Sequence, residues 1–220
     1  MMGTRLKALV DRREKVRGKR ARAYRRWQKT GKPGYLKNFR KLNETAKALT
    51  KDIVKERKRL GEFRVISREE WGAAPIHGSY TPQSTLIAGV QHHSAMPTLS
   101  ATATIEEEKA RMRQLQAIHL GEGWTDIAYA LVAMPSGRIY EGRPVQYVGA
   151  HTLGHNTGYA GWCLDGNYET SKPTKAALQA CRRMRKLCGV ADKPLYGHYQ
   201  LTPTACPGKN MIPSLTNGDI

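Results

Sequence analysis

The chain has 220 residues, 40% of them hydrophobic, and a formal net charge of +19 at pH 7. That length and apolar content suffice for one domain of ordinary size plus an appendage. No apolar run approaches the ~20 residues of a membrane-spanning helix, and the four cysteines are too few for a disulfide-stapled scaffold.

The positive charge lies almost wholly in the first part of the chain. Residues 1–60 contain 22 Lys and Arg against 5 Asp and Glu, whereas residues 61–220 contain 15 against 13. Proline, glycine and aromatic residues enter at about Glu62, where the composition changes. We therefore expect a basic helical segment over residues 1–61 and a nearly neutral domain over residues 62–220. Such an asymmetry favours an anionic partner for the basic segment.

Two helices are predicted in the basic segment, because "KTGKPG" at residues 29–34 interrupts helical sequence with two glycines and a proline. Apolar residues at 3–4 spacing form a narrow seam on the second helix, at Phe39, Leu42, Ala46, Leu49, Ile53 and Leu60. The first helix offers Leu6, Val10, Tyr24 and Trp27. The hairpin is either a solvated or self-associating element, or an arm that binds anions. Its excess charge repels itself and favours the arm.

Strands and helices alternate after the basic segment. "STLIAGVQHHSAMP" predicts a buried strand, and residues 101–120 predict a helix with acidic residues in its first turns. "DIAYALVAMPSGRIYEGRP" predicts a β-hairpin, and "AGWCLDGN" another short strand. Residues 174–190 predict an amphipathic helix whose apolar side holds Ala177, Leu178, Cys181, Met184, Leu187 and Cys188. This alternation predicts an α/β domain around one sheet.

A histidine and a cysteine lie eight residues apart in "GHYQLTPTACPGK", at His198 and Cys206, and "HHS" ends the predicted strand at His92 and His93. Zinc prefers imidazole and thiolate ligands, and a catalytic site keeps three protein ligands and one open position. The alternative is that the histidines are ordinary polar residues and Cys206 is a buried thiol. The spacing alone leaves both open, because no C-x-x-C or H-E-x-x-H motif is present.

Five motifs follow one another along the chain: "ISREEWGA", "VQHHSA", "GWTDIAYALVAMPSGRIYEGRP", "VGAHTLGHNTGYAGWCLDGN" and "GHYQLTPTACPG". In these motifs, from about Val65 to Pro213, the chain resembles the zinc-dependent N-acetylmuramoyl-L-alanine amidases of the peptidoglycan recognition protein and bacteriophage lysozyme type. The resemblance implies a central mixed β-sheet flanked by helices, one Zn²⁺ per chain, and bacterial peptidoglycan as the partner.

Matching the motifs residue by residue implies a set of site residues. The metal ligands are His92, His198 and Cys206, the catalytic residues are Tyr129 and Thr204, and the residues near the substrate are His93, His151 and Asn156. Cys163 is the competing thiol, but it lies within a predicted strand, where a small buried hydrophobe is the commoner role.

The resemblance implies a peptidoglycan hydrolase that cleaves the amide between N-acetylmuramic acid and L-alanine with zinc-activated water. The N-terminus has no apolar stretch of signal-peptide length, and with the basic segment this favours a phage endolysin, made in the host cytoplasm and acting on the wall after release. Residues 1–60 would then bind anionic envelope polymers or a membrane surface. The alternatives are a non-catalytic peptidoglycan-recognition module, an amidase whose basic segment binds nucleic acid, and an intracellular muropeptide-recycling amidase.

Overall fold

The structure is a computed structural model of the chain. It describes residues 4–59 and 65–220; for residues 4–7, 10 and 53–59 it describes the backbone alone. Two compact units are present, Met1–Phe63 and Arg64–Ile220. The expected boundary at Glu62 and the seam residue Leu60 lie outside the described residues, as do the side chains of Leu6, Val10 and Ile53.

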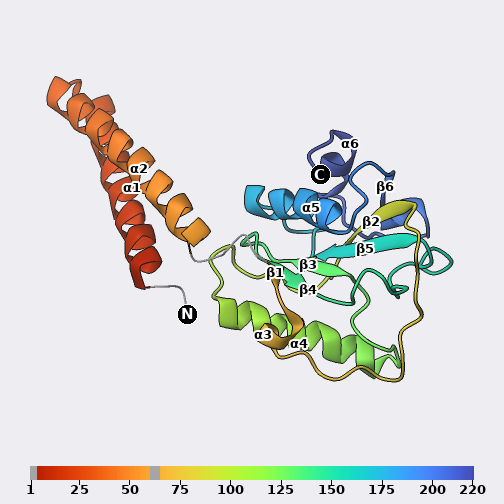
Figure 1. Cartoon of the computed structure of the whole chain (residues 1–220). Helices are drawn as coiled ribbons and strands as arrows, with labels where there is room; N and C mark the ends of the chain where they lie inside the picture. The colour runs from red at the N-terminus through yellow and green to blue at the C-terminus, as the bar shows by residue number, and fades with distance from the viewer. Residues whose placement is uncertain (1–3, 60–64) are drawn as a thin grey trace. The chain divides into compact units, whose positions relative to one another are not determined.

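The first unit is the expected helical hairpin, formed by α1 (Thr4–Thr30) and α2 (Pro33–Arg59) (Figure 1). Gly31 has a φ of 65°, and its N–H donates to the carbonyl of Trp27 at 2.8 Å. Glycine tolerates this left-handed conformation, which commonly ends a helix. Pro33 then begins α2, where its fixed φ suits the first turn. The predicted break at residues 29–34 is confirmed.

Small and aromatic side chains form the seam between the two helices. Ala23 of α1 and Ala46 and Leu49 of α2 are buried. The rings of Tyr24 and Phe39 pack with their centroids 5.2 Å apart. The hairpin therefore has a small apolar interface of its own, as the 3–4 spacing predicts.

A mixed six-stranded sheet forms the centre of the second unit, in the order β1-β4-β3-β5-β2-β6. β3 and β4 are antiparallel, and the other neighbouring strands are parallel. The strands are β1 (Val65–Ile66), β2 (Ala88–His93), β3 (Leu131–Ala133), β4 (Ile139–Glu141), β5 (Tyr159–Leu164) and β6 (Leu195–Gly197). The predicted fold class is confirmed. So are the four strands expected from the sequence, which are β2, the β3–β4 hairpin and β5.

Helices cover both faces of this sheet (Figure 1): α3 and α4 lie on one face, and α5 and α6 on the other. They are α3 (Arg68–Trp71), α4 (Ile105–Gly121), α5 (Lys175–Leu187) and α6 (Ile212–Thr216), with a short 3-10 helix η1 (His198–Gln200) after β6. Thr104 caps α4 by accepting a hydrogen bond from the N–H of Glu107, whose carboxylate bonds back to the N–H of Thr104. In the part of the chain that the structure describes, no helix is long and apolar enough to cross a membrane.

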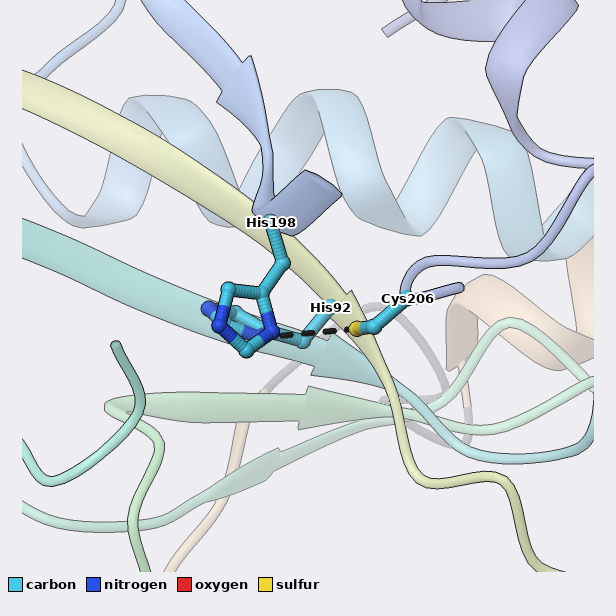
Figure 2. A group of neighbouring side chains, drawn as sticks. All are labelled: His92, His198 and Cys206. Atoms are coloured by element: carbon cyan, nitrogen blue, oxygen red, sulfur yellow. Dashed lines mark hydrogen bonds between the residues drawn. The ribbon is translucent and has the colours of Figure 1, made fainter. Parts of the chain in front are cut away.

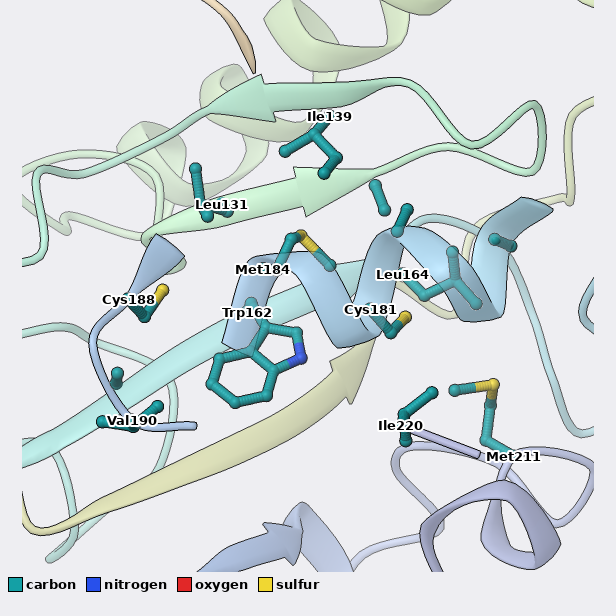
Figure 3. Packing of buried hydrophobic residues seen from close by; sticks show 14 of the residues in the cluster. Leu131, Ile139, Trp162, Leu164, Cys181, Met184, Cys188, Val190, Met211 and Ile220 are labelled. Atoms are coloured by element: carbon teal, nitrogen blue, oxygen red, sulfur yellow. The ribbon is translucent and has the colours of Figure 1, made fainter. Parts of the chain in front are cut away.

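The larger core lies between α5 and the sheet, around Trp162 and Met184 (Figure 3). Most of the apolar side predicted for α5 is buried there. Leu187 is the exception, because it is 46% exposed and lines an open groove with Val65 and Leu131 at the end of the helix. Leu187 thus lies at the exposed margin of the predicted apolar side.

Candidate metal centre

The pairing of β2 with β6 brings two of the predicted metal ligands together. The strands are parallel, and Gln91 lies opposite Gly197. His92 follows Gln91 in β2, and His198 follows Gly197 as the first residue of η1. The two histidines are therefore neighbours although they are far apart in the sequence.

The side chains of His92, His198 and Cys206 converge on one point (Figure 2). Their possible ligand atoms all lie within 4.8 Å of one another. The Sγ atom of Cys206 is 3.6 Å from Nδ1 of His92, and the centroids of the two imidazole rings are 4.5 Å apart. His92 and Cys206 are buried, whereas His198 is partly exposed. The cluster therefore lies at the edge of the core, where solvent and a substrate can approach it.

Burial sets the protonation of the three side chains. It lowers the pKa of His92 well below its ordinary value, and the neighbouring histidines lower that pKa further. Burial also lowers the pKa of His198, so both rings are neutral near pH 7, the state in which histidine binds a metal. Burial raises the pKa of Cys206 to about 12, although a hydrogen bond from the backbone of His93 opposes this. The thiol therefore keeps its proton until a cation replaces it.

Backbone hydrogen bonds hold Cys206 in place. The N–H of Tyr199 donates to the carbonyl of Cys206 at 2.8 Å and closes the loop between the two predicted ligands. The N–H of His93 donates to Sγ at 3.3 Å. The N–H of Cys206 donates to Oγ1 of Thr204 at 3.2 Å. These three hydrogen bonds hold both the backbone and the sulfur atom of Cys206 in place.

A chain of hydrogen bonds behind His92 orients its ring. Nε2 of His92 lies 3.2 Å from Nδ1 of His151, and Nε2 of His151 lies 3.4 Å from the carbonyl of Tyr159. A proton on Nε2 of His151 donates to that carbonyl, which leaves Nδ1 to accept a proton from Nε2 of His92. His92 then presents the lone pair of Nδ1 toward Cys206, as a metal ligand requires. Burial lowers the pKa of His151 to about 4, which keeps the ring neutral for this role.

Two glycines make room for the His151 ring. A Cβ atom on Gly161, in β5, would lie 2.3 Å from ring atoms of His151, and a Cβ atom on Gly149 would lie 2.5 Å from the same ring. Neither distance is compatible with a side chain. The sequence "GAHTLGHNTGYAG" thus places glycine at the two points where the backbone passes the ring.

Two of the residues predicted to lie near the substrate make contacts within the protein. His93 points to the opposite side of β2 from its neighbour, and its Nδ1 accepts a hydrogen bond from the N–H of Tyr168 at 3.2 Å. Oδ1 of Asn156 accepts a hydrogen bond from the N–H of His151 at 2.7 Å. Both side chains stabilise loops around the cluster. A contact of His93, His151 or Asn156 with substrate stays a prediction.

Tyr129 lies next to the cluster, half-buried in the loop before β3. Its ring centroid is 5.3 Å from that of His92 and 5.6 Å from that of His119. Burial raises the pKa of Tyr129 well above its ordinary value, and the nearby thiols raise it further. Its hydroxyl therefore remains protonated and is a hydrogen-bond donor near neutral pH.

Buried polar contacts fix the loop that carries Tyr129. Asp126 is fully buried, forms an ion pair of 2.8 Å with Arg68, and accepts a hydrogen bond from Gln116 at 2.7 Å. The guanidinium of Arg143 donates to the carbonyls of residues 126, 127 and 148. The loop is thus held on both sides, which positions the Tyr129 ring.

The remaining predicted residues differ in their surroundings. Thr204 is exposed, and its hydroxyl accepts the hydrogen bond from Cys206 described above. Cys163 lies opposite His92 in the sheet and is fully buried, so that its pKa is raised well above the ordinary value. Within residues 4–59 and 65–220, the group of side chains that could share a metal does not include Cys163.

Thr152 is a site residue that the sequence analysis does not predict. Its Oγ1 is 2.9 Å from Nδ1 of His151 and 3.4 Å from Nε2 of His92. It therefore supports the same orientation of the two rings. Its position after His151 in "GAHT" is the one local signal of this role.

A mixed sheet with helices on both faces, and two histidines and a cysteine meeting at the end of a central strand, defines an α/β protein with a candidate zinc centre. Residues 83–209 match the family described as N-acetylmuramoyl-L-alanine amidase, and the chain belongs to this family.

Curated relatives agree with this assignment. The chain is 40% identical over 157 residues to an N-acetylmuramoyl-L-alanine amidase of Sus scrofa. The aligned region covers 68% of the chain and 26% of that relative. It is 31% identical over 168 residues to a peptidoglycan recognition protein of Trichoplusia ni. Here the aligned region covers 72% of the chain and 89% of the relative. The chain thus spans about a quarter of the pig protein and most of the Trichoplusia protein.

Solved structures share the fold. The peptidoglycan recognition protein LB of Drosophila matches with a TM-score of 0.64 and 31% identity, over 70% of the chain and 92% of that structure. Peptidoglycan recognition protein LE matches with a TM-score of 0.64 and 30% identity, over 70% of the chain and 92% of that structure. It was solved in complex with tracheal cytotoxin, a monomeric diaminopimelic acid-type peptidoglycan.

Proposed function

We propose that the chain is a zinc-dependent amidase that cleaves the bond between N-acetylmuramic acid and the L-alanine of the peptidoglycan stem peptide. The observation that carries this proposal is the convergence of His92, His198 and Cys206 beside Tyr129 in a chain of the amidase family.

The donor set fits zinc. Two neutral imidazoles and one thiol supply three of the four ligands of a tetrahedral site, and a thiolate favours zinc over harder cations. The separation of at most 4.8 Å between donor atoms allows one ion to contact all three. Zinc bound there supplies a Lewis acid that polarises a carbonyl oxygen and lowers the pKa of water toward ~7.

The chain's own side chains prepare the site for hydrolysis. His151 and Thr152 hold His92 in the tautomer with a free Nδ1 lone pair. The protonated hydroxyl of Tyr129 is proposed to donate a hydrogen bond to the oxygen that gains negative charge when water attacks the amide. Thr204 is proposed to give a second, neutral hydrogen bond. Its oxygen accepts from the N–H of Cys206, which leaves its own proton available.

A recognition module without catalysis is the second candidate, because structural relatives include a recognition protein with bound peptidoglycan fragment. The complete set of three metal donors favours the enzyme, since binding alone requires no metal with an open position. Peptidoglycan is the proposed partner in both cases.

The cellular role that we propose is lysis from within, as by a phage endolysin made in the host cytoplasm and reaching the wall after release. The strongly basic first unit supports this proposal, because it offers a means of retention on anionic envelope material. Production of the protein inside bacterial cells, with and without permeabilisation of the cytoplasmic membrane, tests the role. Lysis only after permeabilisation is expected, and intact cells after permeabilisation would contradict it.

Digestion of purified peptidoglycan tests the enzymatic proposal. New amino groups and new reducing ends are followed in parallel, with protein that is untreated, chelated, or chelated and reloaded with zinc. We expect new amines with N-terminal L-alanine, no new reducing ends, loss on chelation and recovery with zinc. Binding without amine release by zinc-loaded protein would favour the recognition module.

A further inference from the structure

The part of the helical hairpin next to its turn carries positive charge and no negative charge. Residues 15–43 contain 12 Lys and Arg and no Asp or Glu. The flanking acids Glu14 and Glu44 form ion pairs of 3.1 Å with Arg17 and 2.9 Å with Lys47. Apart from Arg17, the cations between these two acids therefore make an uncompensated positive field.

A groove between α1 and α2 gathers part of this charge. It has a volume of about 390 Å³ and is lined by Lys19, Arg22, Ala23, Arg26, Tyr35, Asn38 and Leu42. Ala23 is buried, whereas the three cations are exposed. In the described part of the chain, none of these three cations forms an ion pair with a carboxylate.

The arrangement of the cations suits a chain of repeated anions. Lys19, Arg22 and Arg26 follow i, i+3, i+7 spacing, so they line one side of α1 about 5 and 6 Å apart along its axis. Guanidinium groups bind phosphate oxygens in pairs. On the other wall, the amide of Asn38 can bond hydroxyl groups. The ring of Tyr35 lies 5.9 Å from the guanidinium carbon of Arg26 and supports it.

The surface of the hairpin disfavours a bilayer and nucleic acid. Membrane-surface helices expose large apolar side chains beside their cations. Among the described side chains of the hairpin, Tyr24 is the one exposed large hydrophobe, at 39%. Single-stranded nucleic acid stacks its bases on aromatic side chains, and the one ring that lines the groove, Tyr35, already lies against the guanidinium of Arg26. A duplex cannot enter a groove between helices whose axes are about 8–10 Å apart, so it would reach the groove cations only from outside.

We propose that the groove at Lys19, Arg22 and Arg26 binds a flexible polyol-phosphate chain, a polymer of sugar alcohols joined by phosphodiesters. This site is separate from the metal centre in residues and in chemistry. The proposal does not depend on amide cleavage, and its test requires no peptidoglycan.

The test compares two variants of the full-length protein that lose the same charge. One replaces the groove cations, as Lys19→Gln, Arg22→Gln and Arg26→Gln. The matched control replaces three exposed cations outside the groove, as Arg25→Gln, Lys37→Gln and Arg40→Gln. Binding to synthetic poly(glycerol phosphate) is measured by calorimetry from about 50 to 300 mM salt, and circular dichroism at 222 nm checks that both variants remain helical.

The groove variant is expected to lose about tenfold or more in affinity at low salt. Its plot of log affinity against log salt becomes less steep by about 2, because three phosphate contacts at about 0.7 each are lost. The control is expected to lose about threefold or less. Equal losses in the two variants would overturn the proposal. So would tighter binding of wild-type protein to single- or double-stranded oligonucleotides with the same number of phosphates, or to anionic vesicles.

Discussion

Nε2 of His92 lies 3.2 Å from Nδ1 of His151, and this contact decides which nitrogen of His92 faces the metal centre. His151 is 7% exposed, and its other nitrogen is directed to the carbonyl of Tyr159. The resemblance suggests a place for His151 beside the substrate, whereas its contacts in the structure are those of a residue that positions a ligand.

Replacement of His151 by Phe is expected to weaken zinc binding by about 10–100-fold, the usual effect of losing a partner that orients a metal-binding histidine. Gly161→Ala should act in the same direction, because its Cβ would collide with the His151 ring. Competition with a chromophoric chelator measures the affinity. His155→Phe, in the same loop, is the control and should bind zinc normally. Unchanged affinity in His151→Phe would refute the positioning role.

Tyr129→Phe is expected to lower kcat by about 100-fold, because removing one hydrogen-bond donor from a developing oxyanion typically has an effect of this size. Zinc affinity should not change, since the hydroxyl is not a ligand. The raised pKa of Tyr129 also predicts that the wild-type rate does not fall through ionisation of this tyrosine below about pH 10. A variant with full activity at saturating zinc would remove Tyr129 from the mechanism.

Thr204→Ala is expected to lower kcat by about fivefold, which corresponds to one neutral hydrogen bond of about 1 kcal/mol. Thr204→Ser keeps a hydroxyl that can accept from Cys206 and donate to substrate, so it should restore the rate. The measurement is amine release at saturating zinc. Equal rates for wild-type protein and Thr204→Ala would assign the side chain to the loop alone.

His119 makes the stability of the second unit depend on pH. It is 6% exposed, its Nδ1 accepts a hydrogen bond from the N–H of Ala128 at 3.2 Å, and its ring stacks on Trp124. Burial, and to a lesser extent the charge of Arg143, lower its pKa from 6.5 to about 4. Between these values the unfolded chain binds a proton that the folded chain does not. Stability from this group is therefore present above pH 6.5 and is lost as the pH falls to about 4.

The expected loss from His119 is about 3 kcal/mol between pH 7 and pH 4. Urea unfolding of wild-type protein and His119→Gln, both with excess chelator, measures it at the two pH values. The stability difference between the two proteins should shrink by that amount at low pH. A difference that is independent of pH would show that His119 binds its proton equally well in the folded and unfolded chains, and would contradict the lowered pKa.

The sequence predicts the long, strongly patterned elements of the fold. β2 is a buried apolar run, and α5 has a clear apolar face, so each could be located within a few residues. β1 and β6, of two and three residues, carry no periodicity that could reveal them. α3 could have been found, because Ser67 and Glu70 form a capping box that is visible as S-x-x-E.

The three metal ligands could be predicted from the motifs. The strand pairing and the neighbouring side chains that position these ligands could not. His198 meets His92 because β6 pairs with β2, and local sequence does not show which strands pair. The role of His151 depends on the space that Gly149 and Gly161 leave for its ring. That space is a property of packed segments, and no spacing in the sequence indicates it.

The most direct test of a metal-dependent amidase compares zinc content and amine release from peptidoglycan in Cys206→Ser and Cys188→Ser. Cys188 is a buried thiol at the end of α5 and is not one of the three clustered donors, so its variant controls for the loss of a cysteine. We predict one zinc per chain and amine release for Cys188→Ser, and neither for Cys206→Ser. Full zinc content and activity in Cys206→Ser would contradict the proposed site.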